Sequence, residues 1–152
     1  MAETDTMLIR TLNFGEIEVP EERILRFKEG LPGFAQIQQF TLLEFEDLKP
    51  FVYLQAIGEP PIALLLVDPR LVDPGYQYKL GPSDLDDVGI VDASEASVYV
   101  VATIPANPEN ATVNLMAPIV VNEKGRRGKQ VIMLDSPYSV RHPMLGSSQS
   151  GS

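Results

Sequence analysis

The chain has 152 residues, of which 44% are hydrophobic and 22% are charged, so its length fits one domain and its composition is that of a globular protein. Its formal net charge of −9 disfavours broad binding to nucleic-acid phosphates or anionic lipid and favours a basic partner. The absence of cysteine excludes disulfides, thiolate metal ligands and cysteine nucleophiles, and suits a reducing compartment.

The N-terminal sequence MAETDTMLIR lacks the basic region and long apolar stretch of a targeting signal. The longest apolar run, IALLLV at 62–67, is far shorter than the roughly 20 residues of a membrane span. We therefore expect a cytoplasmic protein with a flexible N-terminus at 1–6 and one domain at 7–145. The low-complexity tail GSSQSGS at 146–152 is expected to be disordered.

Short runs rich in β-branched and aromatic residues, separated by Gly, Pro, Asn and Asp, predict an all-β and mainly antiparallel fold. The expected strands are 7–12, 16–19, 24–27, 40–45, 51–57, 62–68, 76–80, 97–104, 112–121 and 129–134. The glycine in LNFGE at 12–16 predicts a hairpin between the first two. Tight connections with 13 prolines and 11 glycines favour a small β-barrel-like domain over a doubly wound α/β fold.

Helix is expected in only one or two short segments. In GFAQIQQF at 33–40, apolar residues at three-residue intervals predict one or two helical turns. In GPSDLDDVGI at 81–90, Ser83 is a candidate N-cap, the aspartates that follow suit the positive end of a helix, and Gly89 is a candidate C-terminal stop.

The residue types that enzymes need are scarce. His142 is the only histidine, and a lone histidine before a proline is more often structural than catalytic or metal-binding. The acidic run at 83–95 contains enough carboxylates for acid and base chemistry, but a solvated acidic face explains it better. We therefore expect no enzyme activity, cofactor or metal, and the remaining class is a protein-binding module.

A basic segment, NEKGRRGKQ at 122–130, allows two interpretations. It lies between two predicted strands and contains two glycines, which favours a charged hairpin tip. The alternative is a small RNA-binding β-barrel that uses the hairpin at 124–129, with affinity that falls steeply with salt. A third possibility is a small-ligand carrier, which requires an open barrel interior.

One asparagine and one proline interrupt the apolar run TVNLMAPIVV at 112–121. Pro118 has no N–H group to donate to a ladder, so it belongs at an edge or a bulge. Asn114 needs hydrogen-bond partners if it is buried. Two roles are open for it, ordering the preceding PANPEN loop or facing a protein ligand.

Four segments together resemble the FliW family of flagellar assembly factors in order and spacing: EGLPGFAQIQQF at 29–40, PFVYLQAI at 50–57, VVATIPANPENATVNLMAPIVVN at 100–122 and GKQVIM at 128–133. The resemblance runs from about residue 7 to residue 145. It implies a small β-barrel-like fold and a non-enzymatic, chaperone-like role in the cytoplasm during flagellum biogenesis.

The resemblance also implies two partners. Members of the family bind flagellin before its export, and they bind CsrA, a small basic RNA-binding protein that represses translation of flagellin mRNA. Export of flagellin frees the factor, which then antagonises CsrA from a surface away from its RNA site and raises flagellin synthesis. We expect no direct contact with nucleic acid or membrane, and a monomer when the protein is free.

Flagellin termini form amphipathic helices that need an apolar groove. The candidate protein-binding residues are Leu31, Pro32, Phe34, Phe51, Leu54, Ile104, Pro105, Asn114, Leu115, Met116, Pro118 and Ile119. The basic partner CsrA would be attracted by acidic residues, mainly through its association rate. The candidates are Asp84, Asp86, Asp87, Asp92 and Glu95.

Overall fold

The computed structural model describes residues 5–144, so residues 1–4 and the predicted disordered tail at 146–152 lie outside the described part of the chain. The strands are β1 (Thr6–Arg10), β2 (Glu16–Pro20), β3 (Ile24–Phe27), β4 (Gln39–Glu44), β5 (Val52–Ala56), β6 (Ala63–Val67), β7 (Ser97–Thr103), β8 (Thr112–Val113), β9 (Ile119–Asn122), β10 (Arg127–Gln130) and β11 (His142–Pro143). The helices are α1 (Pro69–Val72) and α2 (Pro82–Val88), and the 3-10 turns are η1 (Glu21–Arg23), η2 (Glu46–Leu48), η3 (Ala93–Glu95) and η4 (Pro108–Asn110).

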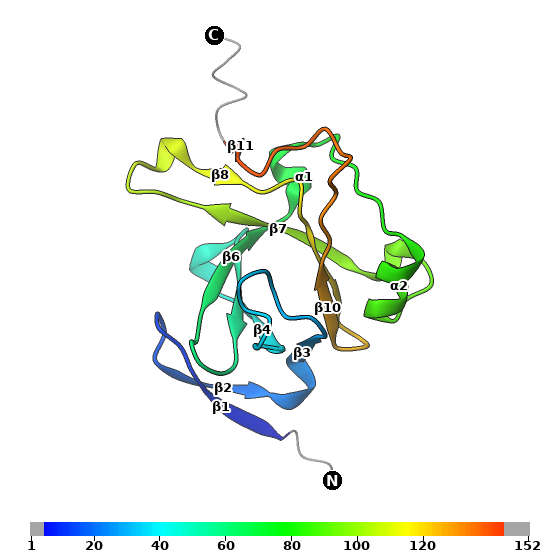
Figure 1. Cartoon of the computed structure of the whole chain (residues 1–152). Coiled ribbons are helices and arrows are strands. Elements are labelled where there is room, and N and C mark those ends of the chain that lie inside the picture. The colour runs from blue at the N-terminus through cyan, green and yellow to red at the C-terminus, as the bar shows by residue number, and fades with distance from the viewer. Residues whose placement is uncertain (1–4, 145–152) are drawn as a thin grey trace.

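A ring of strands in the order β7, β6, β5, β4, β3, β10, β9 closes into a barrel, because β9 pairs with β7 (Figure 1). An odd number of strands cannot alternate in direction all the way around, so one neighbouring pair must be parallel. That pair is β3 and β10, where Arg26 lies beside Arg127 and Phe27 beside Gly128. The other contacts of the ring are antiparallel. The predicted all-β, mainly antiparallel, barrel-like fold is confirmed.

The predicted strand TVNLMAPIVV divides into β8 and β9, which lie along the same edge of β7. Val113 pairs with Ala102, and Ile119 pairs with Tyr99. From Tyr99 to Ala102, β7 advances by three residues, whereas the paired segment from Val113 to Ile119 advances by six. The three extra residues form a bulge within 114–118. The prediction that Pro118 sits at a bulge or edge is confirmed.

Pro118 also explains why β9 begins at Ile119 and why β10 ends at Gln130. Their antiparallel register continues beyond both strands, since the Val131 N–H donates to the Pro118 carbonyl (2.9 Å) and the Met133 N–H donates to the Met116 carbonyl (2.8 Å). Pro118 has no N–H to return, so the regular ladder stops. The predicted strand 129–134 consequently ends at Gln130.

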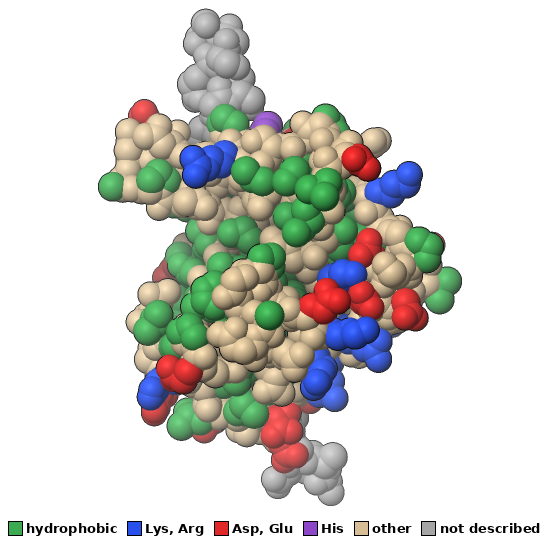
Figure 2. Space-filling model, in the orientation of Figure 1, with side chains coloured by type: hydrophobic (Ala, Val, Ile, Leu, Met, Phe, Trp, Pro, Cys, Tyr) green, Lys and Arg blue, Asp and Glu red, His purple; other side chains and the backbone are tan. Residues whose placement is uncertain are grey.

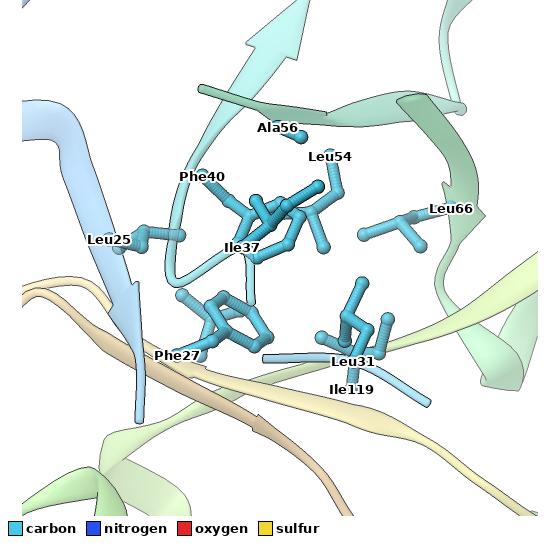
Figure 3. Close-up of a cluster of buried hydrophobic side chains, with 10 residues drawn as sticks. Leu25, Phe27, Leu31, Ile37, Phe40, Leu54, Ala56, Leu66 and Ile119 are labelled. Carbon is cyan, nitrogen blue, oxygen red and sulfur yellow. The ribbon is translucent and has the colours of Figure 1, made fainter. Parts of the chain in front are cut away.

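Apolar side chains fill the barrel interior (Figure 3). The rings of Phe27 and Phe40 meet edge to face with their centroids 4.9 Å apart. Leu31 and Ile37, from the loop 28–38, belong to the same buried cluster, so this loop closes one end of the barrel. A packed interior of this kind gives no support to the small-ligand carrier.

Two further apolar clusters lie outside the barrel interior. Val88 and Ile90, at the end of α2 and after it, pack with Val120 and Val131. The segment 76–80 packs elsewhere, and the hydroxyl of its buried Tyr76 donates to the Leu115 carbonyl at 2.8 Å. This segment has no ladder partner among residues 5–144, so the predicted strand at 76–80 is wrong.

The hairpin predicted from LNFGE is confirmed and joins β1 to β2. Thr11 holds the turn, since its N–H and hydroxyl both donate to the Gly15 carbonyl (2.9 and 2.7 Å). Gly15 has a φ of 68°, which favours glycine. Phe14 covers the barrel side of the turn, with its ring centroid 4.5 Å from that of Phe45.

The helical predictions have mixed outcomes. The predicted helical turns at 33–40 are wrong, because residues 31–36 form tight turns around glycines of positive φ, and β4 begins at Gln39. The helix predicted near residue 83 exists as α2 and ends at Gly89, whose φ is 74°. Its N-cap is Gly81, not Ser83, and the Gly81 N–H donates to the Asp84 carboxylate at 3.0 Å.

Helix α1 was not predicted. The Asp68 carboxylate accepts the Arg70 N–H at 2.9 Å, and Pro69 occupies the first helical position. These are ordinary start signals, but a four-residue helix has too short a pattern to be detected from periodicity.

Candidate functional site

A groove of about 570 Å³ lies where the loop 28–38 approaches the arm formed by β7 and β8. Figure 2 shows the molecule hollowed below this arm, with hydrophobic side chains on the walls. We term it the mouth groove, and its lining residues are Leu31, Pro32, Phe34, Leu64, Val101, Thr103, Pro105, Asn110, Thr112, Asn114, Gln130, Val140 and Arg141. The structure thus brings together five predicted site residues that are far apart in sequence: Leu31, Pro32, Phe34, Pro105 and Asn114.

The segment GLPGF builds one wall of the groove. Gly30 has a φ of 65°, and a Cβ atom at this position would lie 2.6 Å from the Phe34 carbonyl oxygen. The Phe34 N–H donates to the Leu31 carbonyl at 2.7 Å and closes the turn. Leu31 is buried in the barrel core, whereas Pro32 is exposed and Phe34 is half-buried. Leu31 therefore anchors the segment, and Pro32 and Phe34 present apolar surface to the groove.

Asn114 lies on the opposite wall and is half-buried. Its side-chain oxygen accepts the N–H groups of Met116 (3.1 Å) and Ala117 (3.2 Å), while its own N–H donates to the Val101 carbonyl (3.0 Å). Asn114 thus orders the bulge that follows it, and the PANPEN loop before it is not its hydrogen-bond partner. Asn114 also lines the groove, so this structural role leaves it a member of the candidate site.

Three other predicted residues do not line the groove. Ile104 is 46% exposed and sits between the lining residues Thr103 and Pro105. Phe51 is half-buried against the cluster that contains Tyr76. Met116 is half-buried within the bulge. Of these three residues, Ile104 alone combines an exposed side chain with sequence neighbours that line the groove.

Four predicted site residues must be reassigned to the interior. Leu54, Leu115 and Ile119 have no exposed surface, since they pack in the apolar clusters of the strands and the bulge. Pro118 is buried beside β10, where its carbonyl accepts a hydrogen bond. A partner protein cannot touch these side chains in the folded chain, and their apolar character reflects core packing.

Four of the five acidic residues predicted to steer a partner have local roles. Lys129 of β10 lies 2.8 Å from the Asp84 carboxylate and 2.6 Å from that of Asp87. Lys28 approaches Asp87 at 3.5 Å. In Figure 2 acidic and basic side chains intermingle on this part of the surface. The charges of Asp84 and Asp87 are therefore largely neutralised and tie α2 to the barrel.

This ion cluster changes the protonation equilibria of its members. The hydrogen bond from Lys129 holds the pKa of Asp87 below its ordinary value, against the opposing effect of burial. Burial lowers the pKa of Lys129, but its hydrogen bonds to Asp84 and Asp87 outweigh that effect and raise the pKa above the ordinary value. Both shifts favour the charged pair.

Asp92 and Glu95 cap the 3-10 turn η3. The Asp92 carboxylate accepts the Ser94 N–H at 3.0 Å, and that backbone hydrogen bond lowers the pKa of Asp92. Glu95 accepts the N–H groups of Val91 (3.0 Å) and Asp92 (2.8 Å). Within residues 5–144, Asp86 is the predicted steering residue whose carboxylate makes neither an ion pair nor a hydrogen bond.

The basic segment forms the turn between β9 and β10, as the hairpin interpretation predicted. Arg126 has a φ of 59°, and its guanidinium donates to the Glu21 carbonyl at 3.1 Å. Lys129 is bound to two carboxylates. Two of the four basic side chains are thus engaged within the protein, which weakens the case for an RNA-binding surface here.

A larger hollow, of about 1250 Å³, lies between segments 76–82 and 131–138. Its tyrosines are occupied with each other and with the backbone, since the Tyr138 hydroxyl accepts the Gln77 N–H at 2.8 Å. Asp84 is the single predicted site residue among those that line it. We therefore place the candidate site at the smaller mouth groove, where the predicted residues converge.

Sequence reasoning missed most of the strand residues in the groove. Leu64 and Val101 come from β6 and β7, and Arg141 comes from the segment before β11. These residues come together only when the barrel closes, and a local sequence pattern does not predict that closure. The run of exposed residues at 103–110, which contains two prolines, is the single local signal of a surface loop beside the site.

Comparisons with known proteins are consistent with this fold and its family motifs. A family model described as FliW protein matches residues 8–144. Proteins described as flagellar assembly factor FliW are similar along nearly the whole chain: that of Pseudothermotoga lettingae is 40% identical over 136 residues (89% of this chain and 86% of the relative), and that of Geobacillus kaustophilus is 38% identical over 139 residues (91% and 96%).

A solved crystal structure of the flagellar assembly factor FliW aligns with a TM-score of 0.85 at 36% identity, covering 91% of this chain and 96% of that one. None of the helices within residues 5–144 has the length and apolar character needed to cross a membrane. The closed barrel, the GLPGF turn at its end, and the match over residues 8–144 lead to one conclusion: this chain belongs to the FliW family of flagellar assembly factors.

Proposed function

We propose that this protein binds flagellin in the cytoplasm through the mouth groove, without catalysis, and keeps it competent for export. The observation that carries the proposal is the convergence of Leu31, Pro32, Phe34, Pro105 and Asn114 in one groove. The groove offers apolar side chains on the walls near Phe34 and Val101 and polar side chains such as Asn110 and Gln130 between them. Such a mixed surface suits an amphipathic helix, which is the form that flagellin termini take, because the helix can pack its apolar face and hydrogen-bond at its margins.

The test places a large charged side chain in the groove. Thr103 lines the groove at one end of β7, and Ser97 lies exposed at the other end of the same strand. We expect Thr103→Arg to weaken binding of purified flagellin at least about tenfold in calorimetry, because the long charged side chain would occupy the groove and binding of an apolar helix face would have to desolvate it. Ser97→Arg, the matched control, should bind like the wild type. Wild-type affinity for a folded Thr103→Arg variant would refute the groove as the flagellin site.

We further propose that the protein, when free of flagellin, binds CsrA and relieves repression of flagellin translation. The net charge of −9 supports attraction of a basic partner. Since four of the five predicted steering carboxylates have local partners, the attraction would come from the overall field and not from one acidic patch. A translation extract repressed by CsrA should recover on addition of this protein and be repressed again by excess flagellin. Failure of the protein to restore translation would reject this branch.

A further inference from the structure

The hairpin of β1 and β2 forms a two-stranded sheet of its own, and β1 is its outer strand (Figure 1). The other edge of β1 has no strand partner within residues 5–144. A free edge presents unpaired backbone donors and acceptors and is a template for addition of another strand. This surface shares no residue with the mouth groove.

The hydrogen bonds at the two ends of the hairpin show which groups point outward. The Glu21 N–H donates to the Asp5 carbonyl at 2.8 Å, and the Thr11 N–H donates to the Gly15 carbonyl at 2.9 Å. In an antiparallel pair, alternate residues of a strand direct their backbone toward the partner. Odd-numbered residues of β1 therefore face β2, and the N–H and C=O groups of Thr6, Leu8 and Arg10 face the open edge.

The centre of this edge is apolar. The side chain of Leu8 is 60% exposed, and Leu12, just beyond the strand, is 73% exposed. β1 contains neither a proline nor a lysine, two of the devices that block edge pairing in natural sheets. An added strand would place an apolar residue beside Leu8 and form backbone hydrogen bonds at alternate positions.

Charge indicates what kind of strand fits. Arg10 is paired with Glu59 at 3.5 Å, which leaves the hairpin with the carboxylates of Asp5, Glu16 and Glu18. All three are exposed, and none lies within 4.0 Å of a basic group in the part of the chain that the structure describes. A second copy of this chain would bring a second set of three carboxylates to the same sheet, which is unfavourable. A basic strand would be attracted by them across β1, since unlike charges about two strand spacings apart still interact at low salt.

We propose that the outer edge of β1 binds an extended, basic segment of a partner protein by strand addition. The segment has an apolar residue opposite Leu8 and lysine or arginine at neighbouring positions. This second surface is independent of the mouth groove, so its failure would leave the proposed flagellin site intact.

The experiment uses the whole protein and a fluorescein-labelled, acetylated hexapeptide that alternates valine and lysine, with binding measured by fluorescence anisotropy. Leu8→Pro removes an outward N–H without breaking a bond to β2, since proline is tolerated on the open side of an edge strand. We expect it to weaken binding by about tenfold. Leu8→Ala, which keeps the N–H, should weaken binding by less than about fivefold. Thermal melting verifies that both variants fold.

Charge is tested at Glu18, which lies opposite Leu8 on β2, so β1 separates it from the added strand by two strand spacings, roughly 10 Å. Glu18→Lys should weaken binding of the valine–lysine peptide by about twofold at low salt and strengthen binding of a valine–glutamate peptide, because charges at this separation still interact within a Debye length. Equal binding of both peptides to the wild type, or equal affinities of the Leu8→Pro and Leu8→Ala variants, would overturn the proposal. Sedimentation that shows a wild-type dimer abolished by Leu8→Pro would also overturn it, because the occupant would then be a second copy.

Discussion

Asn114 shows how a polar residue can be required inside an apolar run. Its side-chain oxygen satisfies two N–H groups in the bulge between β8 and β9, where the strand geometry offers them no partner. The same side chain lines the mouth groove. A substitution at this position therefore affects folding and the candidate groove together, and the two effects must be measured separately.

We predict that Asn114→Ala lowers the free energy of unfolding by about 1–2 kcal/mol, because two partly buried N–H groups lose their acceptor. Urea denaturation measures the change. Asn114→Asp keeps an acceptor oxygen and should lose less. If the alanine variant were as stable as the wild type, the bulge would not depend on this side chain.

Glycine is required at position 128 because the core leaves no room for a side chain, and not because the backbone has a positive φ there. A Cβ atom here would overlap the ring of Phe27, which fills the barrel where β3 meets β10. We predict that Gly128→Ala costs about 1–3 kcal/mol of stability through overpacking. Gly75→Ala is the matched control, because the nearest atom to its Cβ would be the Asp73 carboxylate oxygen at 3.7 Å. A thermal shift of equal size in both variants would contradict the explanation.

At the scale of elements, α2 is held to β10 by charge as well as by apolar packing. Lys129 binds two carboxylates of the helix, and Val88 packs against β9 and the segment after β10. Such a short helix is not stable by itself in water, so these contacts determine whether it forms. The stability of this region should therefore depend on pH.

The pKa of Asp87 is lowered in the folded protein, so folding favours its ionised form. Its contribution is complete above the unfolded-state pKa, about 3.9, and is lost as the pH falls through the lower folded value. We predict that Asp87→Asn destabilises the protein by roughly 1 kcal/mol at neutral pH, since the pair is partly exposed. The difference from the wild type should vanish in acid. Asp86→Asn is the matched control, because it removes a carboxylate of the same helix that has no ion-pair partner among residues 5–144, and it should cost less stability at neutral pH in urea titrations.

Several elements could be predicted from sequence, and the failures have physical causes. The strand at 24–27 was located with its observed bounds, because alternating burial on a short segment is a local pattern. The run 112–121 was recognised as β, but its bulge depends on the register with β7, which is set by the barrel. The segment 33–40 has helical spacing, yet Ile37 is placed by core packing around glycine turns and not by a helix.

The candidate site follows the same division. Loop residues such as Pro32 and Pro105 were predicted, because exposed prolines between strands are locally visible. Leu54 and Ile119 were assigned to the surface although they are core residues, since an apolar strand residue has the same sequence character in both places. Which face of a strand is buried is decided by its neighbours in the ring.

For the whole molecule, the topology predicts slow folding. The ring closes through β3 with β10 and through β7 with β9, and the first of these pairs joins residues about a hundred positions apart. Folds dominated by such non-local pairing fold in milliseconds to seconds. We predict refolding on that timescale in stopped-flow experiments that follow the fluorescence of the five tyrosines. Refolding within microseconds would show that ring closure does not limit the rate.

The parallel pairing of β3 with β10 has a consequence for synthesis in the cell. The ribosome makes β3 about a hundred residues before its partner β10. While those residues are being added, the apolar face of β3, with Leu25 and Phe27, has no β10 to cover it. The nascent chain therefore exposes this apolar face until β10 leaves the ribosome, and we expect it to be prone to aggregation during that interval.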